Sequence, residues 1–241
     1  MMGQGDEQHS VDIASYIDHT YLKPDATSSV IDALCNEAIG YRFYSVCVNG
    51  MWVDRCRTRL EGTPVHISAV CGFPLGAMQA SVVAYETAKA AAEGANEIDM
   101  VLPVGAMLDG DLVAVESYIA GVVHAAGSLA RVKVILETGL LTDEQKRAAC
   151  RISEAAGAHY VKTSTGFGPG GATVADIRLM RESVSTQIGV KASGGVRDYS
   201  VAMAMINAGA TRIGTSSGIA IVQGAAGIEG MANNSTGLGS Y

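Results

Sequence analysis

Residues 155–163 of this 241-residue chain read AAGAHYVKT, in which a helical stretch ends at Gly-Ala and an extended apolar segment begins at once. The same order occurs in residues 93–102, EGANEIDMVL, and in residues 207–215, NAGATRIGT. Glycine just past a helix end supplies the left-handed conformation that stops a helix with little strain. Each occurrence therefore predicts a helix followed directly by a strand.

Extended segments of this kind alternate with helical patterns along the chain. The segments that predict strands are residues 16–20, 44–48, 66–70, 97–102, 132–137, 160–163, 188–192 and 212–215. Thr142 and Gln145 have the spacing of a capping box and predict the start of one intervening helix. Eight strand and helix units without a dividing linker predict a single-domain α/β fold, the (β/α)8 TIM barrel.

The predicted barrel occupies residues 16–224. Residues 1–15 are expected to form an N-terminal segment or helix that precedes it. Residues 225–241 are rich in Gly, Ala, Asn and Ser, and we expect them to form a flexible C-terminal tail.

Composition excludes several classes of function. The formal net charge of -7 argues against binding to nucleic acid or an anionic membrane, because such partners select Lys and Arg. The chain has no apolar signal segment near its start and no run of about 18 apolar residues, so we expect a cytoplasmic protein. The five cysteines stand singly and the histidines lack metal-ligand spacing, so neither a disulfide framework nor a metal site is predicted.

The alternation within the strands separates charged from apolar side chains. In residues 97–102, Ile98 and Met100 share one face, and Asp99 lies on the other. The apolar face should pack outward on the helices, so the charged face should point into the barrel. The charged side chains predicted to point inward are Glu97, Asp99, Lys133, Glu137, Lys162 and Lys191.

Charges inside a barrel are costly to bury, by several kcal/mol each unless they are paired. One explanation is an ion-pair network that only fills the core. The other is catalysis: a neutral Lys162 amine could attack a carbonyl, with Lys191 as the nearby cation that lowers its pKa. Asp99 would serve as general acid and base. Together the three residues predict a Schiff-base enzyme.

Glycines and serines follow the last two predicted strands, where TIM barrels often bind phosphate. Small residues at such a position let backbone N–H groups approach a phosphate closely, and serine hydroxyls add donors. The candidate phosphate-binding residues are Gly166, Gly194, Gly195, Gly214, Ser216 and Ser217. Tight turns alone would also use these glycines.

Three residues near the ends of the first two strands are candidates for substrate contact. Asp18, Thr20 and Cys47 reach the carboxyl-terminal rim, where barrel enzymes carry out their chemistry. A purely structural role for each of them stays open.

Several strings resemble the deoxyribose-phosphate aldolase family. They are VKTSTGF at residues 161–167, KASGG at 191–195, GTSSG at 214–218, IDHT at 17–20 and EIDMV at 97–101. The match runs in the family's order from about residue 16 to residue 224, and the lysine strings are highly specific.

This resemblance implies a class I aldolase without metal or other cofactor. Such an enzyme reversibly cleaves 2-deoxy-D-ribose 5-phosphate into D-glyceraldehyde 3-phosphate and acetaldehyde. The resemblance assigns the imine to Lys162, the lowering of its pKa to Lys191, and proton relay to Asp99 with Lys191. Lys133 and the terminal Tyr241 are further candidates, and Phe167 stands where some members carry a phosphate-binding lysine.

Two other functions fit the same residues. One is another Schiff-base barrel aldolase, similar to transaldolase, that acts on longer ketose phosphates. The other is a barrel that binds phosphorylated sugars without catalysis. The family resemblance also implies a homodimer as the assembly.

Overall fold

The computed structural model describes residues 12–227, which form a closed barrel of eight parallel strands. Each strand pairs with the next along the chain, and β8 closes the barrel against β1. The strands are β1 (Ile17–Thr20), β2 (Ser45–Asn49), β3 (His66–Cys71), β4 (Glu97–Val101), β5 (Arg131–Ile135), β6 (Tyr160–Lys162), β7 (Gly189–Ser193) and β8 (Arg212–Thr215). The predicted (β/α)8 barrel is therefore confirmed.

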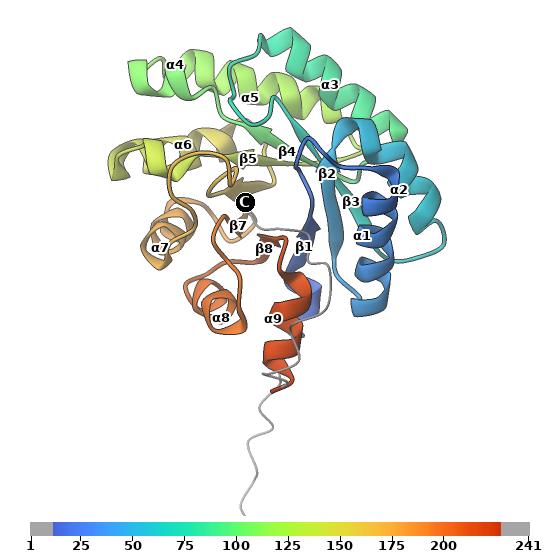
Figure 1. Ribbon diagram of the computed structural model, residues 1–241. Helices are drawn as coiled ribbons and strands as arrows, with labels where there is room; N and C mark the ends of the chain where they lie inside the picture. The colour runs from blue at the N-terminus through green and yellow to red at the C-terminus, as the bar shows by residue number, and fades with distance from the viewer. Residues whose placement is uncertain (1–11, 228–241) are drawn as a thin grey trace, which may run out of the picture.

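Helices surround the strands on every side (Figure 1). They are α1 (Ser28–Tyr41), α2 (Val53–Leu60), α3 (Ala80–Glu93), α4 (Val104–Asp109), α5 (Leu112–Ala126), α6 (Asp143–Ala155), α7 (Val174–Ser183), α8 (Tyr199–Asn207) and α9 (Gly218–Ala225). Short 3-10 helices occur at η1 (Ile13–Tyr16), η2 (Gly50–Trp52) and η3 (Thr138–Leu140). No helix within residues 12–227 has the length and apolar character needed to cross a membrane.

The helix boundaries follow from the local sequence. Gly94 ends α3 with φ of 117°, and its N–H donates to the carbonyls of Ala90 and Ala91. Thr142 and Gln145 form the predicted capping box at the start of α6. These ends are those that the glycine and threonine signals predict.

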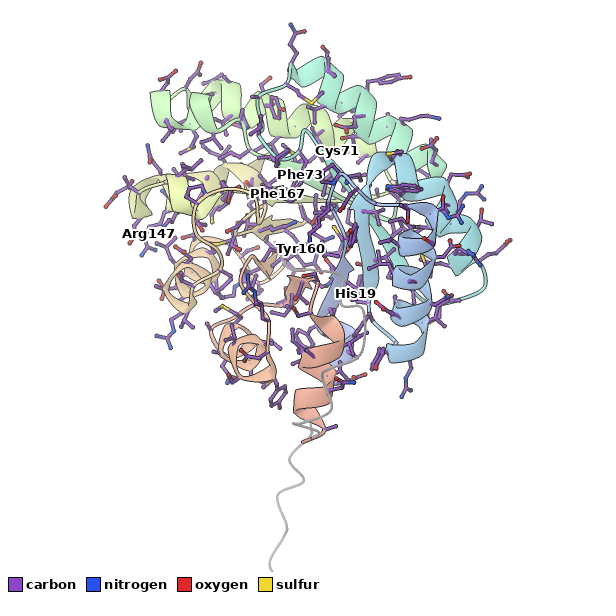
Figure 2. The ribbon with its side chains drawn as sticks, viewed as in Figure 1. His19, Cys71, Phe73, Arg147, Tyr160 and Phe167 are labelled. Carbon is purple, nitrogen blue, oxygen red and sulfur yellow. The ribbon has the colours of Figure 1, made fainter. Side chains whose placement is uncertain are left out.

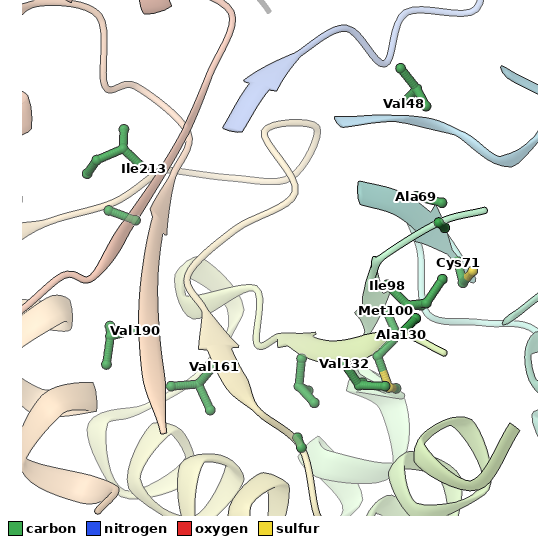
Figure 3. Packing of buried hydrophobic residues seen from close by; sticks show 14 of the residues in the cluster. Val48, Ala69, Cys71, Ile98, Met100, Ala130, Val132, Val161, Val190 and Ile213 are labelled. Carbon is green, nitrogen blue, oxygen red and sulfur yellow. The ribbon is translucent and has the colours of Figure 1, made fainter. Parts of the chain in front are cut away.

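The outward faces of the strands form the hydrophobic core with the helices (Figure 3). Ile98, Met100, Val161 and Val190 are completely buried in this layer. The inward positions alternate with them, and the strand registers place inward residues of neighbouring strands side by side. Asp99 pairs with Lys133 between β4 and β5, and Lys162 pairs with Lys191 between β6 and β7.

Two details differ from the predictions. The chain between β4 and β5 forms two helices, α4 and α5, because Gly110 adopts φ of 77° and ends α4 after six residues. Strand β5 stops at Ile135, so the prediction that Glu137 points inward from this strand is wrong. Glu137 has φ of 56° and belongs to the turn before η3.

Candidate active site

A pocket opens at the carboxyl ends of β1, β6, β7 and β8. Seven residues that the sequence indicated for catalysis or substrate binding line it: Thr20, Lys162, Gly166, Gly194, Gly195, Gly214 and Ser216. Leu22, Thr165, Ser193, Val196, Arg197 and Thr215 complete the lining and were not predicted.

The remaining candidates lie outside the pocket lining. Those fully buried beneath it are Asp18, Cys47, Asp99, Lys133 and Lys191. Ser217 precedes α9, and its N–H donates to Thr215 Oγ1 at 2.9 Å. Tyr241 lies outside the described residues.

Six buried charges form a closed ring of ion pairs inside the barrel, which we call the ion ring. Its members, in order, are Arg212, Glu97, Lys133, Asp99, Lys191 and Asp18, and each contact between neighbours spans 2.5–3.0 Å. Positive and negative groups alternate around the ion ring, so its charges cancel. Such close pairing offsets much of the cost of burying ions.

Lys162 is attached to the ion ring without being part of it. Its Nζ donates to Asp99 Oδ2 at 2.8 Å, and no other carboxylate among the described residues pairs with it. Of the three buried lysines in residues 12–227, only Lys162 lines the pocket. Its amine is therefore the one that a molecule in the pocket could reach.

The electrostatics separate Lys162 from its neighbours. Burial lowers the pKa of the Lys162 ammonium; Asp99 opposes this effect, and the positive charge of Lys191 adds to it. Burial also acts on Lys191, but the carboxylates of Asp18 and Asp99 outweigh it and hold the pKa of Lys191 above its ordinary value. A lysine with a lowered pKa is more often neutral and nucleophilic.

Asp99 is the carboxylate that joins the three lysines. Its Oδ1 accepts from Lys133 and its Oδ2 from Lys162 and Lys191, each at 2.8 Å. Although burial raises the pKa of Asp99, the three ammonium groups outweigh burial and hold it well below the ordinary value. Asp99 is therefore ionised and hydrogen-bonded to the Lys162 amine.

Gly214 makes room for this arrangement. A Cβ at this position would lie 2.3 Å from Ser193 Oγ and 2.8 Å from Lys191 Cε. Any side chain at position 214 would displace Lys191, so this glycine has a packing role as well as its place in the pocket lining.

The loop that carries Gly166 is fixed from below by Glu137 and Thr165. The Thr165 hydroxyl donates to Glu137, and Thr165 Oγ1 accepts the N–H groups of Phe167 at 3.0 Å and Gly168 at 3.2 Å. Gly166 itself adopts φ of 85° and lines the pocket. No pattern in the sequence indicates that Glu137, which lies in a left-handed turn, holds this loop.

The wall formed by β6 to β8 presents unused hydrogen-bond donors. Within the described residues the N–H groups of Gly166, Gly195 and Ser216 donate to no protein acceptor. Arg197, which no sequence pattern indicated, adds a positive charge at the same edge of the pocket. Free amides and a guanidinium are the groups that recognise phosphate.

An apolar cluster lies beside the pocket and reaches it at Leu22. Leu22, Cys47 and Val70 form a small cluster at the ends of β1 to β3, and Phe73 packs against it. Phe73 meets Phe167 edge to face, with ring centroids 5.3 Å apart (Figure 2). Phe167 therefore packs against another aromatic ring at the position where some family members carry a phosphate-binding lysine.

Metal ligands are not assembled at this site. Within residues 12–227, no three His, Cys, Asp or Glu side chains are grouped so that they could hold a metal ion. The chemistry that the arrangement can perform is that of an amine, its carboxylate partner and neighbouring cations.

Comparisons with known proteins agree with this chemistry. Residues 13–224 match the sequence model described as DeoC/LacD family aldolase. Deoxyribose-phosphate aldolase 1 of Bacillus licheniformis is 58% identical over 212 residues, covering 88% of this chain and 95% of that protein. Deoxyribose-phosphate aldolase of Brevibacillus brevis is 60% identical over 210 residues, covering 87% and 95%.

A solved structure extends the similarity to three dimensions. The tetrameric deoxyribose phosphate aldolase from Aeropyrum pernix has a TM-score of 0.82 at 34% identity, covering 88% of this chain and 89% of that chain. Because the sequence match spans all eight strands of the barrel, the chain belongs to the DeoC/LacD family of aldolases.

Proposed function

We propose that this chain reversibly cleaves 2-deoxy-D-ribose 5-phosphate into D-glyceraldehyde 3-phosphate and acetaldehyde through a Schiff base on Lys162. The observation that carries the proposal is the position of Lys162 as an extra cation beside a complete ion ring. The ammonium of Lys162 faces the pocket and has a lowered pKa, which is the state a Schiff-base lysine requires.

The reaction begins when the neutral Lys162 Nζ adds to the C1 aldehyde of the open-chain sugar. Loss of water gives the imine, which draws electrons from the C2–C3 bond as the C3 hydroxyl loses its proton. The bond breaks, glyceraldehyde 3-phosphate leaves, and the enamine of acetaldehyde stays on Lys162. Protonation at C2 and hydrolysis then release acetaldehyde and restore the amine.

Proton transfers in these steps are assigned to the groups around Lys162. Asp99 is ionised and 2.8 Å from Lys162 Nζ, so we assign it the relay of the proton that the amine gives up, which it passes on without keeping. Lys191 contacts the same Asp99 oxygen and stays charged, so it favours the neutral form of the Lys162 amine and stabilises negative charge on substrate oxygens. Lys133 holds the other Asp99 oxygen.

The phosphate of the substrate is assigned to the wall formed by β6 to β8. The free N–H groups of Gly166, Gly195 and Ser216 and the Arg197 guanidinium would bind it, beside Gly194 and Gly214. Ser217, at the N-terminal end of α9, is proposed as a further ligand of the phosphate. Thr20 is the candidate for contact with the sugar hydroxyls, and Asp18 and Cys47 act from beneath the pocket.

The proposal extends to setting and assembly. We place the enzyme in the cytoplasm, in the breakdown of deoxyribose phosphate derived from nucleosides, without nucleic acid or membrane partners. We also propose a homodimer through the apolar surface beside α3, where Met51, Leu75 and Tyr85 are 79%, 74% and 73% exposed. Light scattering on the parent and on Tyr85→Glu tests the dimer: only the parent should have twice the monomer mass.

One pair of assays tests the reaction. Deoxyribose 5-phosphate should yield glyceraldehyde 3-phosphate in a coupled assay, and acetaldehyde with borohydride should leave a stable adduct that mass spectrometry locates at Lys162. Adduct formation with turnover of ketose phosphates only would favour the transaldolase-like alternative. Sugar phosphate binding with neither adduct nor turnover would favour the non-catalytic barrel.

A further inference from the structure

The floor of the barrel carries two charged residues that the reaction does not use directly. Arg212 begins β8 and Glu97 begins β4, and neither is among the residues that line the pocket. Both are almost completely buried, with 3% and 1% of their surface exposed. An ion pair this deep needs a reason, because apolar residues of similar size often give equal or greater stability.

Arg212 has partners on several sides of its guanidinium group. Its guanidinium lies 3.4 Å from the centroid of the Tyr44 ring, and its Nη2 donates to the Tyr160 hydroxyl at 3.1 Å. Its Nη1 donates to Asp18 at 2.8 Å and to Glu97 at 3.0 Å. The guanidinium therefore joins Asp18 and Glu97. From each of these carboxylates one half of the ion ring, here called an arm, leads to Asp99.

The two arms of the ion ring meet again at Asp99, and Lys133 Nζ of one arm also lies 3.5 Å from Asp18 Oδ2 of the other. One arm runs from Asp18 to Lys191, at 2.5 Å, and on to Asp99 at 2.8 Å. The other runs from Glu97 to Lys133, at 2.5 Å, and on to Asp99 at 2.8 Å. Asp99 is the partner of Lys162, so a change in charge on the floor reaches the amine along both arms.

We propose that Arg212 and Glu97 are positioning residues that close the ion ring and thereby leave Lys162 as the one group free to lose its proton. With both present, the ion ring is neutral and Lys162 is surplus. Without Arg212, the ion ring lacks a cation, and a charged Lys162 fills the deficit. Without Glu97, the ion ring holds an extra cation, and Lys162 is driven further toward the neutral amine.

All elements of the barrel contribute to the field around Lys162. The titratable and charged groups at inward positions of the strands are Asp18 on β1, Cys47 on β2, His66 on β3, Glu97 and Asp99 on β4, Arg131 and Lys133 on β5, Tyr160 on β6, Lys191 on β7 and Arg212 on β8. Of these, Asp99, Lys191 and Cys47 act most directly on Lys162. Neither Arg212 nor Glu97 contacts it, so their charges act on Lys162 from a distance, through the field inside the barrel and through the ion ring.

The inference rests on the proposed role of Lys162. Its test is whether two single variants shift the pH midpoint of the trapping rate in opposite directions. The rate of borohydride trapping with acetaldehyde is measured against pH in Arg212→Met, Glu97→Gln and the double variant. Arg212→Met should move the midpoint up by about one pH unit and Glu97→Gln should move it down by about one, because removing a cation or an anion has opposite effects on an ammonium. The double variant should return close to the parent midpoint.

The outcomes separate the two claims. Absence of a Lys162 adduct in the parent enzyme would remove the proposed function itself. An adduct in the parent with midpoints that stay fixed, or that move in the same direction in both single variants, would overturn only the role of Arg212 and Glu97. A purely structural role predicts loss of folded protein, and a double variant worse than either single one.

Two additions keep the test decisive. Thermal melts identify which variants are folded, and if Arg212→Met does not fold, the direction of the Glu97→Gln shift alone decides. The matched control is the surface pair Asp54 and Arg57 on α2, whose side chains are 66% and 59% exposed and 2.6 Å apart. Asp54→Asn and Arg57→Met should leave the trapping midpoint where it is.

Discussion

The inward and outward faces of the same strands have opposite effects on the stability of the barrel. On β4, Ile98 and Met100 face the helices and are completely buried among apolar side chains. Glu97 and Asp99 alternate with them, face the barrel axis and belong to the ion ring. The outward face supplies folding free energy through burial of apolar surface. The inward face lowers this stability, because burying ions costs free energy even when the ions are paired.

This contrast teaches that stability and chemistry are separated by one residue along the chain. A substitution on the outward face should change the free energy of unfolding and leave the reaction intact. A substitution on the inward face should change the reaction, and its effect on stability should depend on whether it breaks the ion ring.

The largest effect is expected at Lys162. Lys162→Met removes the nucleophile and leaves the ion ring complete, so turnover should fall by at least about 10⁴-fold. The melting temperature should stay the same or rise, because an apolar side chain replaces a buried amine that the ion ring does not need. Steady-state kinetics and calorimetry on the same preparation test both halves, and a large loss of stability would contradict the view of Lys162 as surplus.

The next effect is expected at Lys191. Lys191→Leu removes the cation beside Lys162 and breaks the ion ring at Asp18 and Asp99. The pKa of Lys162 should rise, so the amine becomes neutral only at higher pH. Turnover at neutral pH should fall by about 10²- to 10³-fold, and the pH–rate profile should move to the alkaline side.

Stability should also fall in Lys191→Leu, by about 3–5 kcal/mol, because Asp18 loses one of its partners in the interior. The control is Lys89→Leu on α3, which breaks an exposed pair with Glu93 and should change neither rate nor profile. An unchanged profile in Lys191→Leu would mean that Lys191 does not set the state of Lys162.

The sequence was sufficient for the fold and for the lysines of the site. Helix ends marked by Gly-Ala located strands, and alternation within the strands predicted that Lys133, Lys162 and Lys191 face inward. Both signals are local, so a single sequence carries them. The family resemblance then narrowed the chemistry.

The closure of the ion ring was not predictable. Arg212 donates to Asp18 across a separation of 194 residues, and a local pattern carries no information about which inward charges meet. The role of Glu137 was missed for another reason. Its strand ends two residues earlier than the alternation indicated, because a left-handed backbone at Glu137 starts a turn.

An outward substitution should reverse the pattern seen at Lys162. Ile98→Ala leaves a cavity in the apolar layer and should lower the free energy of unfolding by about 2–5 kcal/mol. Turnover at a temperature well below the melting point should stay within about twofold of the parent, because the neighbouring Asp99 keeps its three lysines. Chemical denaturation and kinetics test this, and a large loss of turnover in the folded variant would show that the two faces are coupled.

The smallest effect is expected furthest from the ion ring, at Gly121 on the outer helix α5. A Cβ at Gly121 would meet nothing within 4 Å, and the position is in the middle of a helix of 15 residues. Gly121→Ala should therefore raise the free energy of unfolding by about 0.5–1 kcal/mol, because alanine loses less backbone entropy in a helix. The rate and its pH profile should match the parent, since no group near Lys162 changes.

Gly214→Ala is the inward counterpart of Gly121→Ala. There the added methyl would lie 2.8 Å from Lys191 Cε, which is too close, so turnover should fall while the outer helices stay unchanged. If both glycine variants changed stability and left turnover alone, the separation between a stabilising shell and a reactive interior would fail at its most sensitive point.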